Sequence, residues 1–284
     1  MIYLNTFIFP DENIEFDFII EEKRTCYDSF YPFKILSKNR FERIDFEPTT
    51  ILYGGNGSGK STALNVIAEK TGVNRDSIYN KSNFYSDYVN LCKMYIEDEI
   101  PENSRIITSD DVFDYMLNVR NINQGIDQKR EKLFKEYLDN KGSSFQMNSL
   151  EDYNELKRVN NIRRKTQSKF IRENLMNNVR EYSNGENAFR YFIEKIGENG
   201  LYILDEPENS LSPKLQIELV KFIEDAARFF GCQFIISTHS PFMLAMRGSK
   251  IYDLDESPVC VKRWTELENV RTYYEFFKEY EDEF

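Results

Sequence analysis

The feature that most constrains this chain is a glycine-rich turn between an apolar run, residues 50–53, and a stretch of helical character, residues 60–70. The turn reads Gly54-Gly55-Asn56-Gly57-Ser58-Gly59-Lys60-Ser61, which fits the pattern G-x-x-x-x-G-K-[ST]. Backbone N–H groups freed by glycine converge on phosphate oxygens at the positive end of the following helix. The turn therefore predicts an α/β core with a phosphate-binding loop. We expect Lys60 to neutralise the β/γ charge and Ser61, with Thr62 after it, to ligate Mg²⁺.

A second motif is an apolar strand that ends in two carboxylates. Residues 201–204 read Leu-Tyr-Ile-Leu, and Asp205 and Glu206 follow them. Parallel strands bury their bodies and present their C-terminal tips to ligands. We therefore expect Asp205 at the Mg²⁺ and Glu206 beside it, polarising a water against the γ-phosphate.

The only histidine of the chain follows another strand of buried type. Residues 234–236 are apolar, and Ser237, Thr238 and His239 come directly after them. A lone histidine is usually a core or surface residue without a role. Here the preceding strand predicts that its tip emerges at the same sheet edge as the glycine-rich turn, so we expect His239 to act there.

A weaker signal precedes the second motif by about one helix. Ser183 and Glu186 stand three residues apart with Gly185 between them, which is typical of a capped helix start. We expect a helix to begin near Asn187. Its position shortly before Asp205 gives the segment more weight than its composition does.

The remaining pattern predicts a largely parallel α/β sheet. Residues 1–20 indicate two strands joined by a turn at 10–13, because Ile14, Phe16, Phe18 and Ile20 alternate with other residues at a period near two. Further strands are expected around 44–46, at 105–110 and, as an edge strand, at 250–254. Helices are expected at 215–230 and 265–284.

Residues 111–180 differ in pattern and charge and predict a helical insertion with a turn near residues 142–144. Between Arg120 and Arg180 the chain has 14 lysines and arginines against 8 acidic residues, whereas its overall net charge is −11. The expected organisation is a first core part (1–110), the insertion (111–180) and a second core part (181–284).

Composition excludes several classes of protein. A net charge of −11 argues against general nucleic-acid affinity, which needs basic patches. The apolar runs are too short for a membrane-spanning helix, and the N-terminus lacks a secretory pattern. Four cysteines without a C-x-x-C pair favour a reduced, cytoplasmic protein with buried thiols, and a zinc site is not expected.

In order and wording, these motifs resemble the ATP-binding-cassette (ABC) class of P-loop ATPases. The stretches at 56–62, 201–213 and 234–241 look like stand-alone bacterial AAA/ABC-type ATPases, relatives of the RecF, SMC and OLD groups. The resemblance implies a P-loop NTPase fold: an ABC-like mixed sheet with N-terminal antiparallel strands and a helical insertion. It covers 46–70 and 180–280 well and the insertion poorly.

The resemblance also implies roles. The glycine-rich turn, residues 54–62, would hold ATP; Asp205 with Ser61 would hold Mg²⁺; Glu206 would be the catalytic base and His239 the switch histidine. Ser183, Gly185 and Glu186 would form a signature that acts on ATP bound to the opposite subunit of a head-to-tail homodimer.

The chain departs from the transporter pattern in several places. Asn184 stands where the transporter signature has glycine, and the segment 209–212 lacks the usual aspartate. No glutamine ends the strand at 105–110, so no Q-loop is placed. The aromatic residue that stacks on adenine is left open among Tyr31, Phe33 and Phe41.

Three functions follow from these observations. The first is an ATPase in DNA repair or antiviral defence, with DNA bound by the basic insertion; a solvated helix face explains the charge equally well. Lys157, Arg158 and residues 163–165 form the candidate patch. The second is an ATP-switched module that controls a partner nuclease or toxin. The third, disfavoured by the insertion and the signature, is the nucleotide-binding subunit of a transporter.

Overall fold

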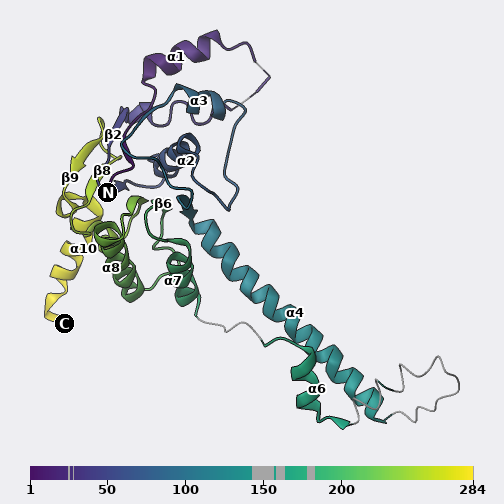
Figure 1. The fold of residues 1–284 in the computed structure, drawn as a ribbon. Coiled ribbons are helices and arrows are strands. Elements are labelled where there is room, and N and C mark those ends of the chain that lie inside the picture. The colour runs from purple at the N-terminus through teal and green to yellow at the C-terminus, as the bar shows by residue number, and fades with distance from the viewer. Residues whose placement is uncertain (25, 28, 143–156, 158–163, 178–182, 284) are drawn as a thin grey trace. The chain divides into compact units, whose positions relative to one another are not determined.

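The computed structural model describes residues 1–24, 26–27, 29–142, 157, 164–177 and 183–283, with the backbone alone at 140–142. The chain divides into two compact units, residues 1–113 with 183–284, and residues 114–182. Figure 1 labels many of the elements of each unit.

The first unit is built on a six-stranded sheet in the order β5-β6-β7-β3-β8-β9. Its strands, in chain order, are β3 (Thr49–Tyr53), β5 (Arg105–Thr108), β6 (Leu201–Asp205), β7 (Gln233–Ser237), β8 (Lys250–Asp253) and β9 (Cys260–Lys262). The first five strands of the sheet order run parallel, and β9 runs antiparallel to β8. The bodies of the parallel strands are mostly buried and apolar, as expected when helices cover both faces of a parallel sheet, whereas Val261 in β9 is exposed. The predicted mixed α/β sheet is confirmed, but β8 is not an edge strand, because β9 pairs with it.

A second, three-stranded antiparallel sheet has the order β2-β1-β4. It contains β1 (Leu4–Ile8), β2 (Arg43–Asp45) and β4 (Lys93–Ile96). The buried Gln233 side chain joins the two sheets: its Oε1 accepts from the N–H groups of Tyr3 and Leu4 at 2.8 and 2.9 Å, and its Nε2 donates to the Leu4 carbonyl at 2.8 Å.

The second strand predicted within residues 1–20 is wrong. Helix α1 (Glu12–Glu21) occupies that place, and Asp11 caps it by accepting from the Ile14 N–H at 2.9 Å. Ile14, Phe16 and Ile20 are exposed, while Glu15 is buried. The alternation of apolar residues therefore does not mark a buried face. The buried carboxylate is held by the Lys34 N–H at 2.7 Å and the Ser37 hydroxyl at 2.8 Å.

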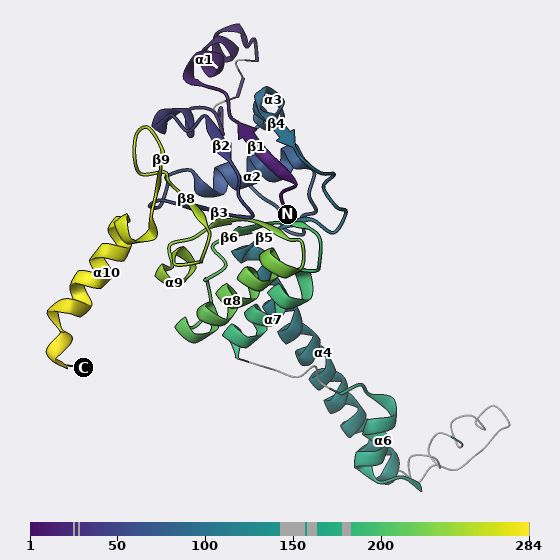
Figure 2. The same cartoon turned by 60° about the vertical axis from the view of Figure 1, so that its left-hand side comes forward.

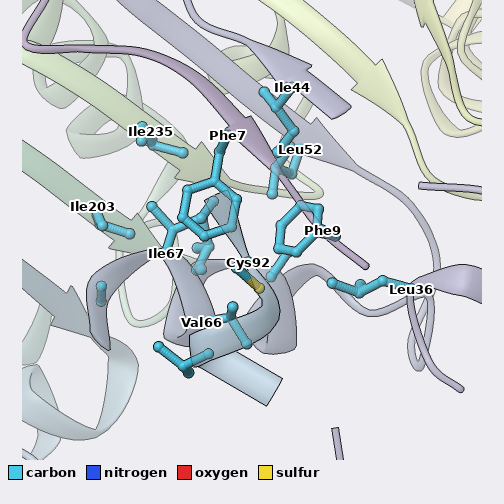
Figure 3. Packing of buried hydrophobic residues seen from close by; sticks show 14 of the residues in the cluster. Phe7, Phe9, Leu36, Ile44, Leu52, Val66, Ile67, Cys92, Ile203 and Ile235 are labelled. Atoms are coloured by element: carbon cyan, nitrogen blue, oxygen red, sulfur yellow. The ribbon is translucent and has the colours of Figure 1, made fainter. Parts of the chain in front are cut away.

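Helix α2 (Lys60–Thr71) lies between the two sheets, and α3 (Tyr85–Leu91) adds to the same core. Figure 2 shows α7 (Asn184–Lys195) and α8 (Pro213–Phe229) on the opposite face of the six-stranded sheet. Figure 3 shows side chains of both sheets and of α2 meeting in one cluster, with Phe7, Ile44, Leu52, Val66, Ile67, Ile203 and Ile235 among them. Burial of this cluster packs α2 against both sheets, and α2 begins directly after the turn that follows β3.

The end of the chain forms short α9 (Pro241–Leu244) and then α10 (Glu268–Glu279). The helix predicted at 265–284 is thus shorter, flanked by the 3-10 turns η3 (Trp264–Glu266) and η4 (Glu281–Glu283). A further 3-10 turn, η1, spans Ser37–Asn39. All four cysteines are free thiols, and Cys26 is exposed rather than buried as predicted.

The second unit contains most of α4 (Ser109–Gly142) and α6 (Gln167–Asn174). The Tyr137 and Phe170 rings pack at 6.0 Å between centroids, and the Tyr137 hydroxyl donates to the Lys165 carbonyl at 3.1 Å. Within the helical insertion predicted at 111–180, α6 covers Phe170 and Ile171, Leu175 is extended, and residues 178–180 lie outside the described residues. The predicted turn at 143–144 lies outside the described residues, and so do Arg158 and Arg163 of the basic patch. Lys165 of that patch is paired with Glu173.

Candidate nucleotide-binding site

Three neighbouring strands bring the three sequence motifs to one edge of the sheet. In the sheet, β7 lies between β6 and β3. Asp205 ends β6, His239 follows β7, and the glycine-rich turn follows β3. Because parallel strands share one carboxyl edge, the motifs meet there. The structure thus brings residues 54–62, 205–206 and 239 together.

The glycine-rich turn needs glycine at two positions for different reasons. Gly59 precedes α2 with φ of +99°, and a Cβ there would meet Leu36 Cδ2 at 2.9 Å. Gly57 has φ of +84° and nothing within 4 Å of its Cβ position, so its backbone borders open space. The left-handed backbone and the free N–H groups at the start of α2 form the kind of concave loop that binds phosphate.

Lys60 lies buried at the centre of the site. Its ammonium donates to the Gly54 carbonyl at 2.6 Å and the Gly55 carbonyl at 3.1 Å, and it lies 2.9 Å from His239 Nε2. Burial lowers the pKa of Lys60, and the nearby carboxylates, Glu206 foremost, oppose that shift. A buried cation held by backbone carbonyls is suited to receive an anion.

Asp205 and Ser61 place oxygen ligands side by side. The Ser61 hydroxyl donates to Asp205 Oδ1 at 3.1 Å, and the Ser237 hydroxyl donates to the same oxygen. Burial raises the pKa of Asp205, and the hydrogen bonds from Ser237 and Ser61 and the nearby charge of Lys60 oppose the shift. A hydroxyl and a carboxylate fit Mg²⁺, which takes one or two protein oxygens together with phosphates and water.

Glu206 and His239 face each other across the tip of the sheet. His239 Nε2 lies 3.5 Å from Glu206 Oε1, and Asn209 donates to Glu206 Oε2 at 3.2 Å. Glu206 has a left-handed backbone, φ of +50°, and its N–H donates to the Ser237 carbonyl at 3.1 Å. Non-glycine residues take this conformation seldom, and it turns the Glu206 side chain out of the strand line.

A cavity of about 320 Å³ opens above the turn. Its lining comprises Ile35, Asn56, Gly57, Gly59, Lys60, Ser61, Thr62 and Glu206. Of the three aromatic residues left open for adenine, Phe33 and Phe41 are buried in the core. Tyr31 is only partly buried, and its hydroxyl lies 3.2 Å from the hydroxyl of Thr62, which lines the cavity.

The predicted signature does not line this cavity. Ser183 caps α7 by accepting from the Glu186 N–H, and Glu186 accepts from the Ser183 N–H at 2.9 Å, so the capping box is present. A Cβ on Gly185 would lie 3.2 Å from the Ser210 carbonyl, so this glycine allows the start of α7 to approach the neighbouring turn. Ser183 and Glu186 are exposed.

Several residues of the site were not predicted from the sequence. The Gly55 N–H donates to both carboxylate oxygens of Asp255 at 2.8 Å. Glu208 and Asn269 bond the segment that carries His239. Glu208 follows Glu206 closely, which is a usable signal. Asp255 and Asn269 come from the far C-terminal part and give no local one.

The comparisons with known proteins agree with this geometry. The model of the family described as ABC transporter matches residues 43–209, which include the glycine-rich turn and both carboxylates. The chain belongs to the ABC family of P-loop ATPases. A model described as AAA ATPase domain also matches residues 185–244 of this ABC ATPase. The protein is therefore an enzyme that binds and hydrolyses ATP.

Solved structures that match this chain include two heads of SMC proteins. The Smc head domain of Pyrococcus furiosus is 15% identical, with a TM-score of 0.39, and the match covers 84% of this chain and 95% of that one. The SMC head domain of Thermotoga maritima is 12% identical, with a TM-score of 0.38, over 92% and 98%. A dimeric ATP-binding cassette bound to ADP and Pi is 13% identical, with a TM-score of 0.36, over 79% and 90%.

No curated protein matches this ABC ATPase. Among the residues that the structure describes, no helix combines the length and the apolar character needed to cross a membrane.

Proposed function

We propose that this ABC ATPase works as a head-to-tail homodimer that closes on two MgATP molecules. The observation that carries the proposal is the exposed start of α7. Ser183 and Glu186 form an ordered, capped helix N-terminus that is absent from the lining of the chain's own cavity. The N-terminus of a helix attracts phosphate, so a twin chain can supply it to the open side of the nucleotide.

Within each site we propose the following division of work. The glycine-rich turn, residues 54–62, and the Lys60 ammonium hold the phosphates. Ser61 and Asp205 hold Mg²⁺, which would neutralise charge on the β- and γ-phosphates. Glu206 orients the attacking water, and His239 contacts the γ-phosphate. The distances that support this are 2.9 Å from His239 Nε2 to the Lys60 ammonium and 3.5 Å to Glu206 Oε1.

The test is the mass of Glu206→Gln in solution with and without MgATP, measured by light scattering. This variant keeps the phosphate-binding loop but loses the base, so we expect it to bind ATP, to stop hydrolysing it and to accumulate as a dimer. The matched variant Glu206→Gln with Ser183→Arg should bind ATP equally and stay monomeric. A monomeric Glu206→Gln protein at saturating MgATP would contradict the dimer.

We further propose that dimer closure drives a partner on DNA, in repair or antiviral defence. The support is the positive excess between residues 120 and 180 in a chain of net charge −11. ATP-dependent, salt-sensitive retention of DNA on a filter tests it. If DNA is not retained, the alternative is an ATP-switched module that holds a nuclease or toxin, and co-purification of a neighbouring gene product in the presence of ATP tests that reading.

A further inference from the structure

Glu208 is an acidic residue close to the catalytic tips whose side chain bonds the segment that carries His239. Its Oε1 accepts three hydrogen bonds: from the Thr238 hydroxyl at 2.7 Å, from the His239 N–H at 2.6 Å and from the Ser240 N–H at 3.1 Å. Hydrogen bonds to an ionised carboxylate are among the strong ones in proteins. One oxygen thus fixes three consecutive residues.

The environment of this carboxylate indicates that its place is fixed by those donors. Glu208 Oε2 is buried and has no hydrogen-bond partner among the described residues. Burial raises the pKa of Glu208, and the bonds from His239 and Thr238 oppose the shift. A carboxylate loses much hydration when it is buried, so it remains in place only where donors compensate.

The carbonyl of His239 is held as well. Asn269, in the first turn of α10, donates from Nδ2 to the His239 carbonyl at 2.7 Å. The Asn269 N–H in turn donates to the Tyr53 hydroxyl at 3.2 Å, at the end of β3. The backbone of His239 is therefore bonded at both its N–H and its carbonyl.

Glu208 is also tied to the proposed base through its own turn. The Asn209 N–H donates to the Glu206 carbonyl at 3.1 Å, and the Asn209 side chain donates to Glu206 Oε2 at 3.2 Å. Glu208 is absent from the lining of the nucleotide cavity, which includes Glu206. Its hydrogen bonds to the described residues go to the histidine segment.

We propose that Glu208, together with Asn269, is a positioning residue that holds the His239 imidazole against Lys60 and Glu206 and so sets the rate of ATP hydrolysis without contributing to ATP affinity. This inference rests on the proposed roles of His239 and Glu206. The turn 206–209 then bonds the base and the histidine segment through adjacent side chains, so that a displacement of the turn moves both groups.

The experiment compares Glu208→Gln with Glu279→Gln, an exposed control at the end of α10. Glutamine keeps the shape but removes the charge that binds three donors. We expect kcat of Glu208→Gln to fall about ten- to a hundredfold, as small misplacements of catalytic groups do, with the ATP Kd within about threefold of wild type. The control should match wild type in both.

A spectroscopic readout separates positioning from folding. Because the chain has one histidine, its imidazole gives a single set of NMR signals. We expect these signals to shift or broaden in nucleotide-free Glu208→Gln and to stay unchanged in Glu279→Gln. This arm needs no hydrolysis, so an inactive wild-type enzyme would refute the proposed function and leave the test of Glu208 intact.

Two results would overturn the inference: a wild-type kcat for Glu208→Gln, or a reduced kcat with unmoved histidine signals. If Glu208→Gln does not fold, Asn269→Ala replaces it, because it removes the bond on the carbonyl side only. The same loss of kcat at constant Kd, with a shifted histidine signal, supports the account. An Asn269→Ala protein identical to wild type in both readouts contradicts it.

Discussion

Replacing Lys60 with methionine should separate ATP affinity from the stability of the fold. Lys60 is 4% exposed, and its ammonium is held by two carbonyls of the turn and by the His239 ring. An ammonium has three donors. If two of them turn to phosphate oxygens, the loss of two charge-assisted hydrogen bonds is about 3 kcal/mol, or about a hundredfold in Kd.

The same substitution should change stability little. Burial lowers the pKa of Lys60, so the folded protein disfavours the charged ammonium. The unfolded chain therefore binds this proton more tightly, and the contribution of Lys60 to the free energy of unfolding rises as the pH rises toward 10.5. Methionine removes the buried charge and loses the bonds to the turn. These effects oppose each other, and we expect the free energy of unfolding to stay within about 1 kcal/mol of wild type.

The assays are calorimetric titration with MgATP and urea unfolding without nucleotide. The matched control is Lys70→Met, in the last turn of the same helix, where the ammonium donates to the Val89 carbonyl at 3.0 Å. It should bind ATP as wild type does. A Lys60→Met protein that is stable and keeps wild-type ATP affinity would refute the reasoning, and so would an equal loss of affinity in the control.

Three more predictions follow from single contacts. Gly59→Ala should unfold at a lower urea concentration than Gly72→Ala. Both variants place alanine at positive φ, which costs about 1–2 kcal/mol, but only at Gly59 does the new Cβ meet a side chain, that of Leu36. Equal urea midpoints would contradict this. Ser183→Ala should lose about 1 kcal/mol of stability through the helix cap, measured by thermal melting, and an unchanged melting temperature would count against the capping box. Burial raises the pKa of Glu15 above its usual value of 4.5, so the folded state binds the proton more tightly than the unfolded state. The stability that protonated Glu15 contributes is therefore lost as the pH rises through the folded pKa, and the stability of Glu15→Gln relative to wild type should rise with pH above about 4.5. A difference in stability that does not depend on pH would refute the raised pKa.

The sequence was informative where function requires a local pattern. The glycine-rich turn, the carboxylates after β6 and the histidine after β7 each follow a buried strand, and parallel pairing brings such positions to one edge. The capping box at Ser183 was also readable, because it depends on two side chains three residues apart.

It misled where tertiary packing overrides alternation. Residues 14–20 alternate as a strand would, yet Asp11 caps a helix there and the buried member is Glu15. Asp255 and Asn269 could not be found, because each reaches the site from a distant part of the chain and no short sequence pattern marks it. The pairing of β9 with β8 was also missed, although Ser257-Pro258 between the two strands is a turn signal.

The most direct test of the account is a crystal structure of Glu206→Gln with Mg²⁺ and ATP. The account predicts that the Lys60 ammonium moves from the Gly54 carbonyl to the phosphates, that Ser61 and Asp205 flank the metal, that His239 contacts the γ-phosphate, and that Ser183 of a twin chain closes the site. Nucleotide bound away from the turn at 54–62, or with His239 out of reach of its terminal phosphate, would contradict it.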